Sequence, residues 1–297
     1  RVTASNTSAP NELSQTHSTI PKPSAFVALR QSTASSNSHF TAKESALLQQ
    51  FRDLLAKDMH RACWAAFPEV VGKWMLLRFL RDSKLNLKEA CKKFRHHISV
   101  RSRFSLDAIR HRVTSTTPQE KLLKYNQTDI VHGAEVAKYL LINYNLSWDP
   151  AGRIIALYSV VGALFRWLSN DPLAAQKFGE YVIEGSVRRQ IQLDLLSRKY
   201  GKVVMGICIV NNHVGGSGWK LAIPGKPRSL GQMWLSLLQS TPSFLSHVHW
   251  LKANWTLRGF AHAAKLTQSD CRVSVYGSED LADLKDLRRD IGEDAVS

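Results

Sequence analysis

The sequence predicts an α/β fold, in which a helical N-terminal unit precedes a layered domain of strands and helices. Two patterns predict it. From Thr41 to about residue 124, apolar residues recur at the spacing of amphipathic helices. From Asp149 onward, short runs rich in Val and Ile alternate with longer amphipathic stretches, which is typical of strands and helices packed as layers. The expected organisation is a tail over 1–40, a helical region over 41–124 and a layered domain over 125–292.

Composition narrows the class of protein. The chain has 297 residues, of which 44% are hydrophobic and 22% charged, so it has enough apolar material for a sizeable core and is not fully disordered. With only 16 Gly and 4 Cys it is neither collagen-like nor a disulfide scaffold. The formal net charge is +16, which suits a nucleic acid, an anionic membrane surface or an acidic ligand.

The first forty residues have the composition of a disordered tail. Fourteen of them are Ser or Thr, with Pro10, Pro21 and Pro23 interspersed. Such a segment cannot bury enough apolar surface to offset the entropy of ordering it. Its net charge is only +2, so the basic surplus belongs to the folded part.

The helical region contains two clear helix starts. Thr41 with Glu44, and Asn86 with Glu89, fit the capping box, in which a polar N-cap is followed three residues later by Glu. Apolar residues follow each start at helical spacing. The other helices expected here are at 69–81, around 106–109, and from Thr117-Pro118 onward.

The layered domain follows a turn signal at Asp149-Pro150-Ala151-Gly152. The continuous apolar run over 202–210 predicts a strand covered on both faces, whereas 271–276 alternates as a half-buried strand does. The remaining elements expected are strands at 153–161 and 247–252, and helices at 171–199, 230–239, 255–266 and from 278 onward.

No catalytic motif is complete. The glycine loop over 215–220 lacks the Gly-Lys-Ser/Thr end of a phosphate-binding loop, and Ser186 lacks the second glycine of a nucleophile elbow. His247 and His249 share one side of a predicted strand without a third metal ligand. We therefore expect no enzyme, no metal and no cofactor. The four cysteines form no CxxC pair, which favours free thiols and a cytoplasmic protein.

Membrane insertion is not expected. The N-terminus has no apolar core of a secretory signal, and the longest apolar stretch, over 154–168, is too short to cross a bilayer and contains Arg166. These observations predict a soluble or peripheral membrane protein.

Basic residues are concentrated between Lys73 and Arg112. This segment has twelve Lys or Arg and three acidic residues, a net charge of +9. The functional interpretation is a surface that faces an anionic partner, and the alternative is the solvated face of a helical bundle. Nucleic acid is the less favoured partner, because no helix-turn-helix, zinc finger or RNP motif accompanies the charge.

Several segments, in order, resemble the CRAL-TRIO lipid-binding family. Leu76–Ala90 resembles the leucine-rich motif that opens the family's helical region, and 149–153 resembles the turn into its first strand. The other resembling segments are 183–204, 242–255 and 271–278. The resemblance extends over roughly residues 45 to 290. It implies a mostly parallel sheet and a movable gating helix that enclose a lipid pocket.

The resemblance also suggests which residues contact the lipid. The expected pocket wall consists of Ile155, Leu157, Val204, Gly206, Cys208, Val248 and Trp250. The expected gating helix presents Trp255, Phe260 and Ala264. Lys84 and Arg272 match cations that hold a headgroup phosphate in phosphoinositide-binding members, but Ser83 and Ser243 replace two other residues of that site.

The function expected from this resemblance is non-enzymatic. The chain would bind one phospholipid or other amphiphile and present or transfer it between membranes, as a monomer that meets an anionic membrane surface. Two alternatives stay open. One is a nucleic-acid-binding module that uses the helices over 73–112, and the other is a scaffold or GTPase-regulatory domain without a ligand.

Overall fold

The computed structural model describes residues 40–59, 66–149, 153–161, 163–204, 206–214, 226–242, 245–251 and 272–275, together with Leu287, Arg289 and Ile291. The chain divides into two units, Arg1–Ala34 and Ser35–Ser297, and all of the described residues lie in the second. Apart from Phe40, the predicted tail lies outside the described residues.

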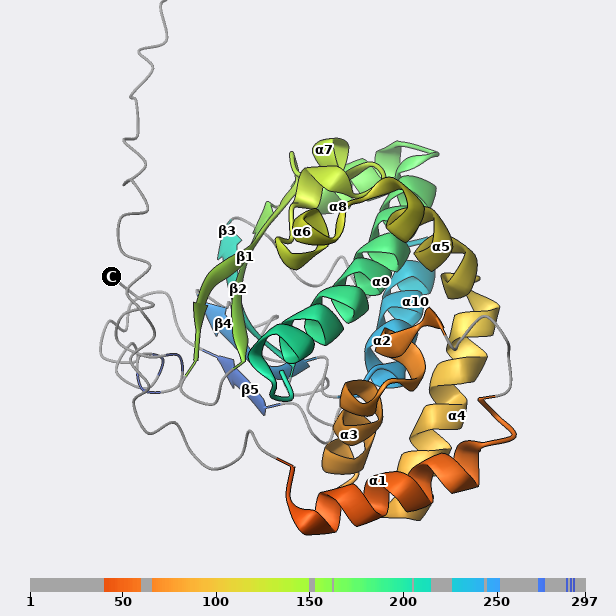
Figure 1. Cartoon of the computed structure of the whole chain (residues 1–297). Coiled ribbons are helices and arrows are strands. Elements are labelled where there is room, and N and C mark those ends of the chain that lie inside the picture. Colours follow the sequence, from red (N-terminus) through yellow and green to blue (C-terminus); the bar gives the residue numbers. More distant parts are fainter. Residues whose placement is uncertain are drawn as a thin grey trace, which may run out of the picture. The chain divides into compact units, whose positions relative to one another are not determined.

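Helices and one sheet build the described part of the second unit, which is an α/β fold (Figure 1). The helices are α1 (Ala42–Leu55), α2 (Pro68–Val71), α3 (Lys73–Asp82), α4 (Leu87–Arg103), α5 (Leu106–Thr116), α6 (Gln119–Leu123), the 3-10 helix η3 (Gln127–Asp129), α7 (Gly133–Val136), α8 (Ala163–Asn170), α9 (Ala174–Tyr200) and α10 (Lys226–Ser240). The strands are β1 (Leu140–Trp148), β2 (Ile154–Val161), β3 (Ile207–Val214), β4 (Leu245–Leu251) and β5 (Arg272–Val275).

Both predicted caps form. The Thr41 hydroxyl accepts from the Glu44 N–H at 3.1 Å, and the Glu44 carboxylate accepts from the Thr41 N–H at 3.0 Å. Asn86 accepts from the Glu89 N–H at 3.1 Å and so begins α4. These signals are local in sequence, which is why sequence alone located both helix starts.

The single helix predicted over 69–81 is wrong: it is two helices, α2 and α3, separated at Gly72. Gly72 has an extended backbone, with φ −70° and ψ 160°. A Cβ at this position would lie 2.3 Å from the Pro68 carbonyl oxygen, so the turn needs glycine. The segment Trp74–Leu80 of α3 is buried on every side, including its arginine, Arg78.

Helix α9 connects the helical region to the sheet. It is 27 residues long and contacts α2, α3, α5 and α6 as well as α7, α8 and α10. Residues 191–197 are all buried, which fits a helix surrounded by other elements. It ends at Gly201, whose φ of +63° is the left-handed conformation that closes many helices.

The sheet has five strands in the order β1-β2-β3-β4-β5. β1 pairs with β2 antiparallel, and the pairs β2–β3, β3–β4 and β4–β5 are parallel. The sequence analysis missed β1, although apolar and polar residues alternate from Ile142 to Trp148 as in a half-buried strand. Asp149 and Arg153 close the β1–β2 pair: the Arg153 N–H donates to Asp149 Oδ1 at 2.8 Å, and their side chains form an ion pair.

The third strand begins five residues later than predicted, at Ile207 instead of 202. Val203 and Val204 precede it and are buried, but the backbone of Val204 bonds to side chains and not to a strand. Gly206 then has a φ of +52°, which an extended strand residue does not adopt. The apolar run therefore combines a buried linker with the beginning of a strand.

Candidate functional site

The two faces of the sheet differ in what covers them. Leu140, Ile142, Ala156 and Tyr158 share one face by strand alternation, and all four are buried. They belong to one apolar cluster with residues of α8 and α9, namely Leu164, Trp167, Leu168, Ala174 and Tyr181. This helix-covered face is an ordinary core layer, and the described helices lie on its side of the sheet in Figure 1.

The opposite side is called the Ile155 face below. Strand register assigns these positions to it: Leu141, Asn143, Ile155, Leu157, Ser159, Val161, Cys208, Val210, Asn212, Val214, His247, His249, Leu251, Arg272 and Ser274. Ile155 and His249 are buried, at 2% and 0% exposure, Leu157 is half-buried, and Leu141 in β1 is 56% exposed. The face thus combines apolar positions and a few amide and hydroxyl positions with cationic and imidazole positions along β4 and β5.

Register brings three of the predicted lipid contacts into one line across the sheet. Ile155 pairs with Cys208, Cys208 with His247, and His247 with Arg272. The predicted headgroup cation Arg272 therefore occupies the same cross-strand line as two predicted wall residues, Ile155 and Cys208. Sequence analysis could not foresee this line, because strand register depends on pairing between distant segments.

Val248 and Trp250, which were predicted in the same wall, occupy positions on the opposite, helix-covered face of the sheet. Val248 pairs with Ile209 and Val273, and Trp250 pairs with Asn211. These positions are in line with Ala156 and Tyr158 of the helix-covered face. One wall on the Ile155 face therefore does not include Val248 or Trp250.

Val204 and Gly206 lie ahead of β3. Val204 is fully buried and packs in a cluster with Ile154, Leu193 and Leu196. Gly206 is also buried. The predicted gating residues, Trp255, Phe260 and Ala264, lie outside the described residues.

Lys84, the other predicted headgroup cation, is presented by a tight turn between α3 and α4. Lys84 and Leu85 both have positive φ, 51° and 63°, and the Leu85 N–H donates to the Leu80 carbonyl oxygen at 2.7 Å. The Lys84 side chain is exposed and makes no ion pair with another described residue.

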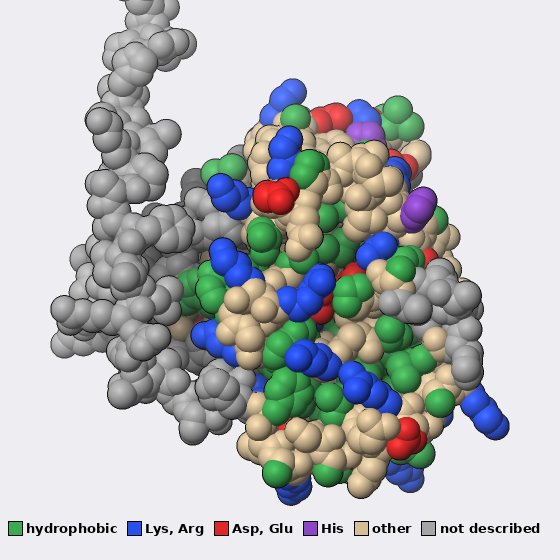
Figure 2. Space-filling view, in the orientation of Figure 1, with side chains coloured by type: hydrophobic (Ala, Val, Ile, Leu, Met, Phe, Trp, Pro, Cys, Tyr) green, Lys and Arg blue, Asp and Glu red, His purple; other side chains and the backbone are tan. Residues whose placement is uncertain are grey.

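The fold neutralises much of the basic segment over 73–112. Among the described residues, six of its twelve cations form ion pairs, four of them with acids from outside the segment. The pairs are Arg81–Glu44, Lys93–Asp82, Arg95–Asp58, Arg101–Asp107, Arg110–Glu69 and Arg112–Glu184. On the face seen in Figure 2, Lys and Arg side chains are spread among other side chains and not gathered in one block.

Arg78 has a structural role. Its Nε donates to the Val204 carbonyl oxygen at 3.0 Å, and its Nη2 donates to the Ser197 hydroxyl at 2.9 Å. That hydroxyl in turn accepts from the Val204 N–H at 3.0 Å, so Arg78 ties α3 to α9 and to the linker before β3. Burial lowers the pKa of Arg78 to about 10 while the Asp194 carboxylate opposes this, and the group stays charged at neutral pH.

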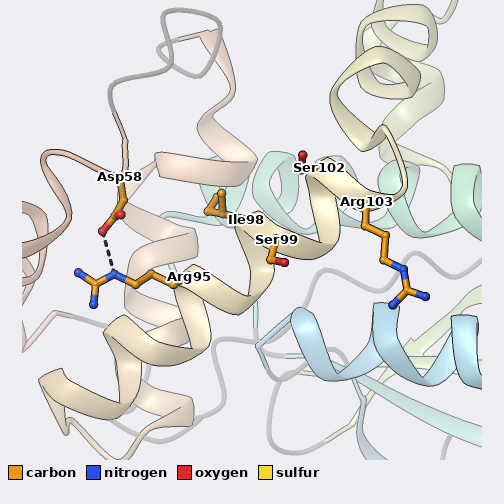
Figure 3. A pocket seen from close by; sticks show the side chains of 6 residues that line it. All are labelled: Asp58, Arg95, Ile98, Ser99, Ser102 and Arg103. Atoms are coloured by element: carbon orange, nitrogen blue, oxygen red, sulfur yellow. Dashed lines mark hydrogen bonds and ion pairs between the residues drawn. The ribbon is translucent and has the colours of Figure 1, made fainter.

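A hollow lies along the exposed side of α4 (Figure 3). Its volume is about 620 Å³, and its lining is Asp58, Arg95, Ile98, Ser99, Ser102 and Arg103. Arg95 points to Asp58 at one end, with 3.0 Å between Nε and Oδ2, and Arg103 stands at the other end. Two hydroxyls and one apolar side chain lie between the arginines, so the hollow can accept anionic groups.

Within the described residues, no group of three or more His, Cys, Asp or Glu is placed to hold a metal ion. The glycine loop over 215–220 and most of the last predicted helix lie outside them. Cys91 is a free, buried thiol. None of the helices in the described ranges combines the length and the apolarity that crossing a membrane requires.

Comparison with known proteins finds a likeness to solved structures but none in sequence. No family model matches the chain, and no curated protein matches it. Among solved structures, the crystal structure of Sfh5 matches with 11% identical residues and a TM-score of 0.48, covering 80% of this chain and 81% of that chain. These comparisons do not show the family to which the chain belongs.

Proposed function

We propose that this chain is a lipid-binding protein of the CRAL-TRIO type, which holds one phospholipid or other amphiphile in an internal pocket and transfers it between membranes. The observation that carries the proposal is the Ile155 face, where apolar positions and the Arg272 position share one side of the sheet away from α8 and α9. A phospholipid, with acyl chains and an anionic phosphate, is complementary to this combination of apolar surface and a cationic group. The ordered motifs of the sequence support the same family.

In this proposal Ile155, Leu157 and Cys208 contribute to the floor of the pocket. The segment with Trp255, Phe260 and Ala264 is the gate, and Arg272 and Lys84 bind a headgroup phosphate. Transfer is driven by removing the lipid's apolar surface from water, and no covalent step, cofactor or metal is involved. Because Ser83 and Ser243 depart from the phosphoinositide-binding pattern, the proposal names a phospholipid without specifying its headgroup.

We propose further that the protein works as a monomer in the cytoplasm and binds membranes peripherally. A carrier must meet the membrane to exchange its lipid. The positive charge of the described surface would favour anionic membranes, at about 1 kcal/mol for each Lys or Arg near the surface.

The test is native mass spectrometry of the purified full chain after incubation with phospholipid vesicles. We expect one lipid per chain, and a lipid that is recovered on denaturation. Leu157→Glu places a charge on the Ile155 face and should lose the bound lipid. Leu54→Glu is the matched control, because Leu54 is 55% exposed on α1, a helix that packs against α3 and α4.

The outcomes separate the alternatives. A wild-type chain that never carries lipid would contradict the proposal and favour a ligand-free scaffold. Lipid retained by a folded Leu157→Glu variant would show that the pocket is not on the Ile155 face.

A further inference from the structure

The exposed face of α4 carries a row of cations that the fold leaves without acidic partners. Lys88, Lys92 and Arg103 are exposed and form no ion pair with another described residue, and His96 is exposed among them. At about 100° per residue, these positions with Arg95, Ser99 and Ser102 span about 120° of the helix. We call these seven residues the α4 basic face.

Much of the rest of α4 is held in the core, so this face is the main surface that the helix offers to a partner. Ala90, Phe94, His97, Val100 and Arg101 are buried, and α4 contacts α1, α3, α5 and α10. The one acid that lines the hollow on this face, Asp58, is engaged by Arg95. Glu89, half-buried at the edge of the face, is the one acid of α4, so the face keeps a net positive charge along about four turns of helix.

We infer that the α4 basic face is the surface by which the protein docks on an anionic membrane. This inference rests on the proposed function, since a lipid carrier has to visit membranes. The apolar side of α4 is already buried, so docking would be electrostatic and reversible, without insertion of the helix. The hollow between Arg95 and Arg103, with Ser99 and Ser102 between them, gives phosphate groups of a membrane a place to bind.

The chemistry of the face favours a membrane over a nucleic acid. Single-stranded nucleic acids bind by stacking on aromatic side chains, and base edges are read largely by Arg, Asn and Gln. Apart from the imidazole of His96, the α4 basic face contains no aromatic side chain, and of these base-reading residue types it has two arginines, without Asn or Gln. A membrane requires only a row of accessible cations, which the face supplies.

The test is flotation of the full chain with phosphatidylcholine vesicles, made with or without phosphatidylserine. The variant is Lys88→Gln/Lys92→Gln. The matched control is Lys121→Gln/Lys124→Gln, which removes the same charge from two exposed lysines at α6. We expect the α4 variant to bind phosphatidylserine vesicles roughly 30-fold more weakly than the wild type, and the control to lose much less. Arg103→Gln, at the other end of the hollow, should weaken binding roughly fivefold.

Equal losses in the α4 variant and the control would overturn the inference, because net charge and not this face would then govern binding. Unchanged vesicle binding in both α4 variants would overturn it too. Gel shifts with RNA and DNA provide the third readout: nucleic-acid binding that depends on Lys88 and Lys92, with no phosphatidylserine dependence, would assign the face to another partner.

The proposed function is judged separately, by lipid loading. The α4 variants should still carry one lipid per chain when loaded from neutral vesicles. If the wild type binds vesicles through α4 but never carries a lipid, the docking inference stands and the proposed lipid pocket is contradicted. Unfolding midpoints close to that of the wild type show that the α4 variants are folded.

Discussion

The buried and exposed faces of α4 use the same residue types in opposite ways. Arg101 is 1% exposed, and its guanidinium donates to Asp107 at 2.8 and 2.6 Å and to Gln190 of α9 at 3.0 Å. Arg103, two residues later, is exposed and makes no ion pair with another described residue. His97 is fully buried against Phe79, whereas its neighbour His96 is exposed. A count of charge along the sequence therefore mixes cations that build the fold with cations that face outward.

The largest difference should appear when the two arginines are changed. Arg101→Met removes all three hydrogen bonds within a buried site, and we expect the free energy of unfolding to fall by about 3 kcal/mol. Arg103→Met should change it by less than about 0.5 kcal/mol. Urea denaturation measures both. Similar losses for the two variants would remove the distinction between the faces.

The two histidines should differ in their effect on acid stability. Burial, with the charge of Arg101, lowers the pKa of His97 to about 3. In the unfolded chain the group has its ordinary pKa of 6.5, so it takes up a proton there first, and the folded state loses stability as the pH falls below 6.5. At pH 5 this amounts to about 2 kcal/mol.

His97→Phe should therefore flatten the decline of stability between pH 7 and pH 5, as measured by urea denaturation at each pH. His96→Gln is the control and should leave the curve unchanged. A curve for His97→Phe that is as steep as that of the wild type would contradict the buried, neutral state of His97.

Two ion pairs allow the same comparison between a largely buried and a more exposed contact. Arg81 and Glu44 are 17% and 9% exposed and join α3 to the cap of α1, whereas Arg95 and Asp58 are 58% and 32% exposed. Double-mutant cycles should give a coupling of about 1 kcal/mol for the first pair and less than about 0.5 kcal/mol for the second. A stronger coupling for the exposed pair would reverse the expected order.

The stability that the Arg81–Glu44 ion pair provides should also depend on pH. Desolvation raises the pKa of Glu44, but the hydrogen bonds from Arg81 and Thr41 outweigh it, and the net pKa lies below the ordinary 4.5. The ionised Glu44 therefore stabilises the folded state above pH 4.5, and this stabilisation is lost as the pH falls through the lowered pKa of Glu44. Glu44→Gln should remove this part of the acid dependence in thermal unfolding at low pH, and an unchanged dependence would contradict it.

Local signals explain what the sequence could predict. The caps at Thr41 and Asn86 each involve residues three apart, and most helices and strands follow from apolar spacing over one segment. Gly72 marks the limit of this reasoning, because the break it makes depends on its contact with Pro68. The start of β3 was missed for a longer-range reason, since the bonds of Val204 go to Arg78 and Ser197.

The candidate site depended even more on distant pairing. Sequence analysis named Ile155, Cys208 and Arg272, but only strand register aligns them across β2, β3 and β5. The same register separates Val248 and Trp250 from them. The partners that neutralise Arg81, Arg95, Arg110 and Arg112 also come from other segments of the chain, so the outward charge of the basic segment could not be counted in advance.

The most direct test of the account is transfer of fluorescent phosphatidylcholine from neutral donor vesicles to acceptor vesicles with or without phosphatidylserine. We predict that the wild type transfers lipid, and does so faster when the acceptor contains phosphatidylserine. The Lys88→Gln/Lys92→Gln variant should transfer to neutral acceptors at the wild-type rate and lose the acceleration. Transfer no faster than the spontaneous rate for the wild type, or full acceleration in the variant, would contradict the account.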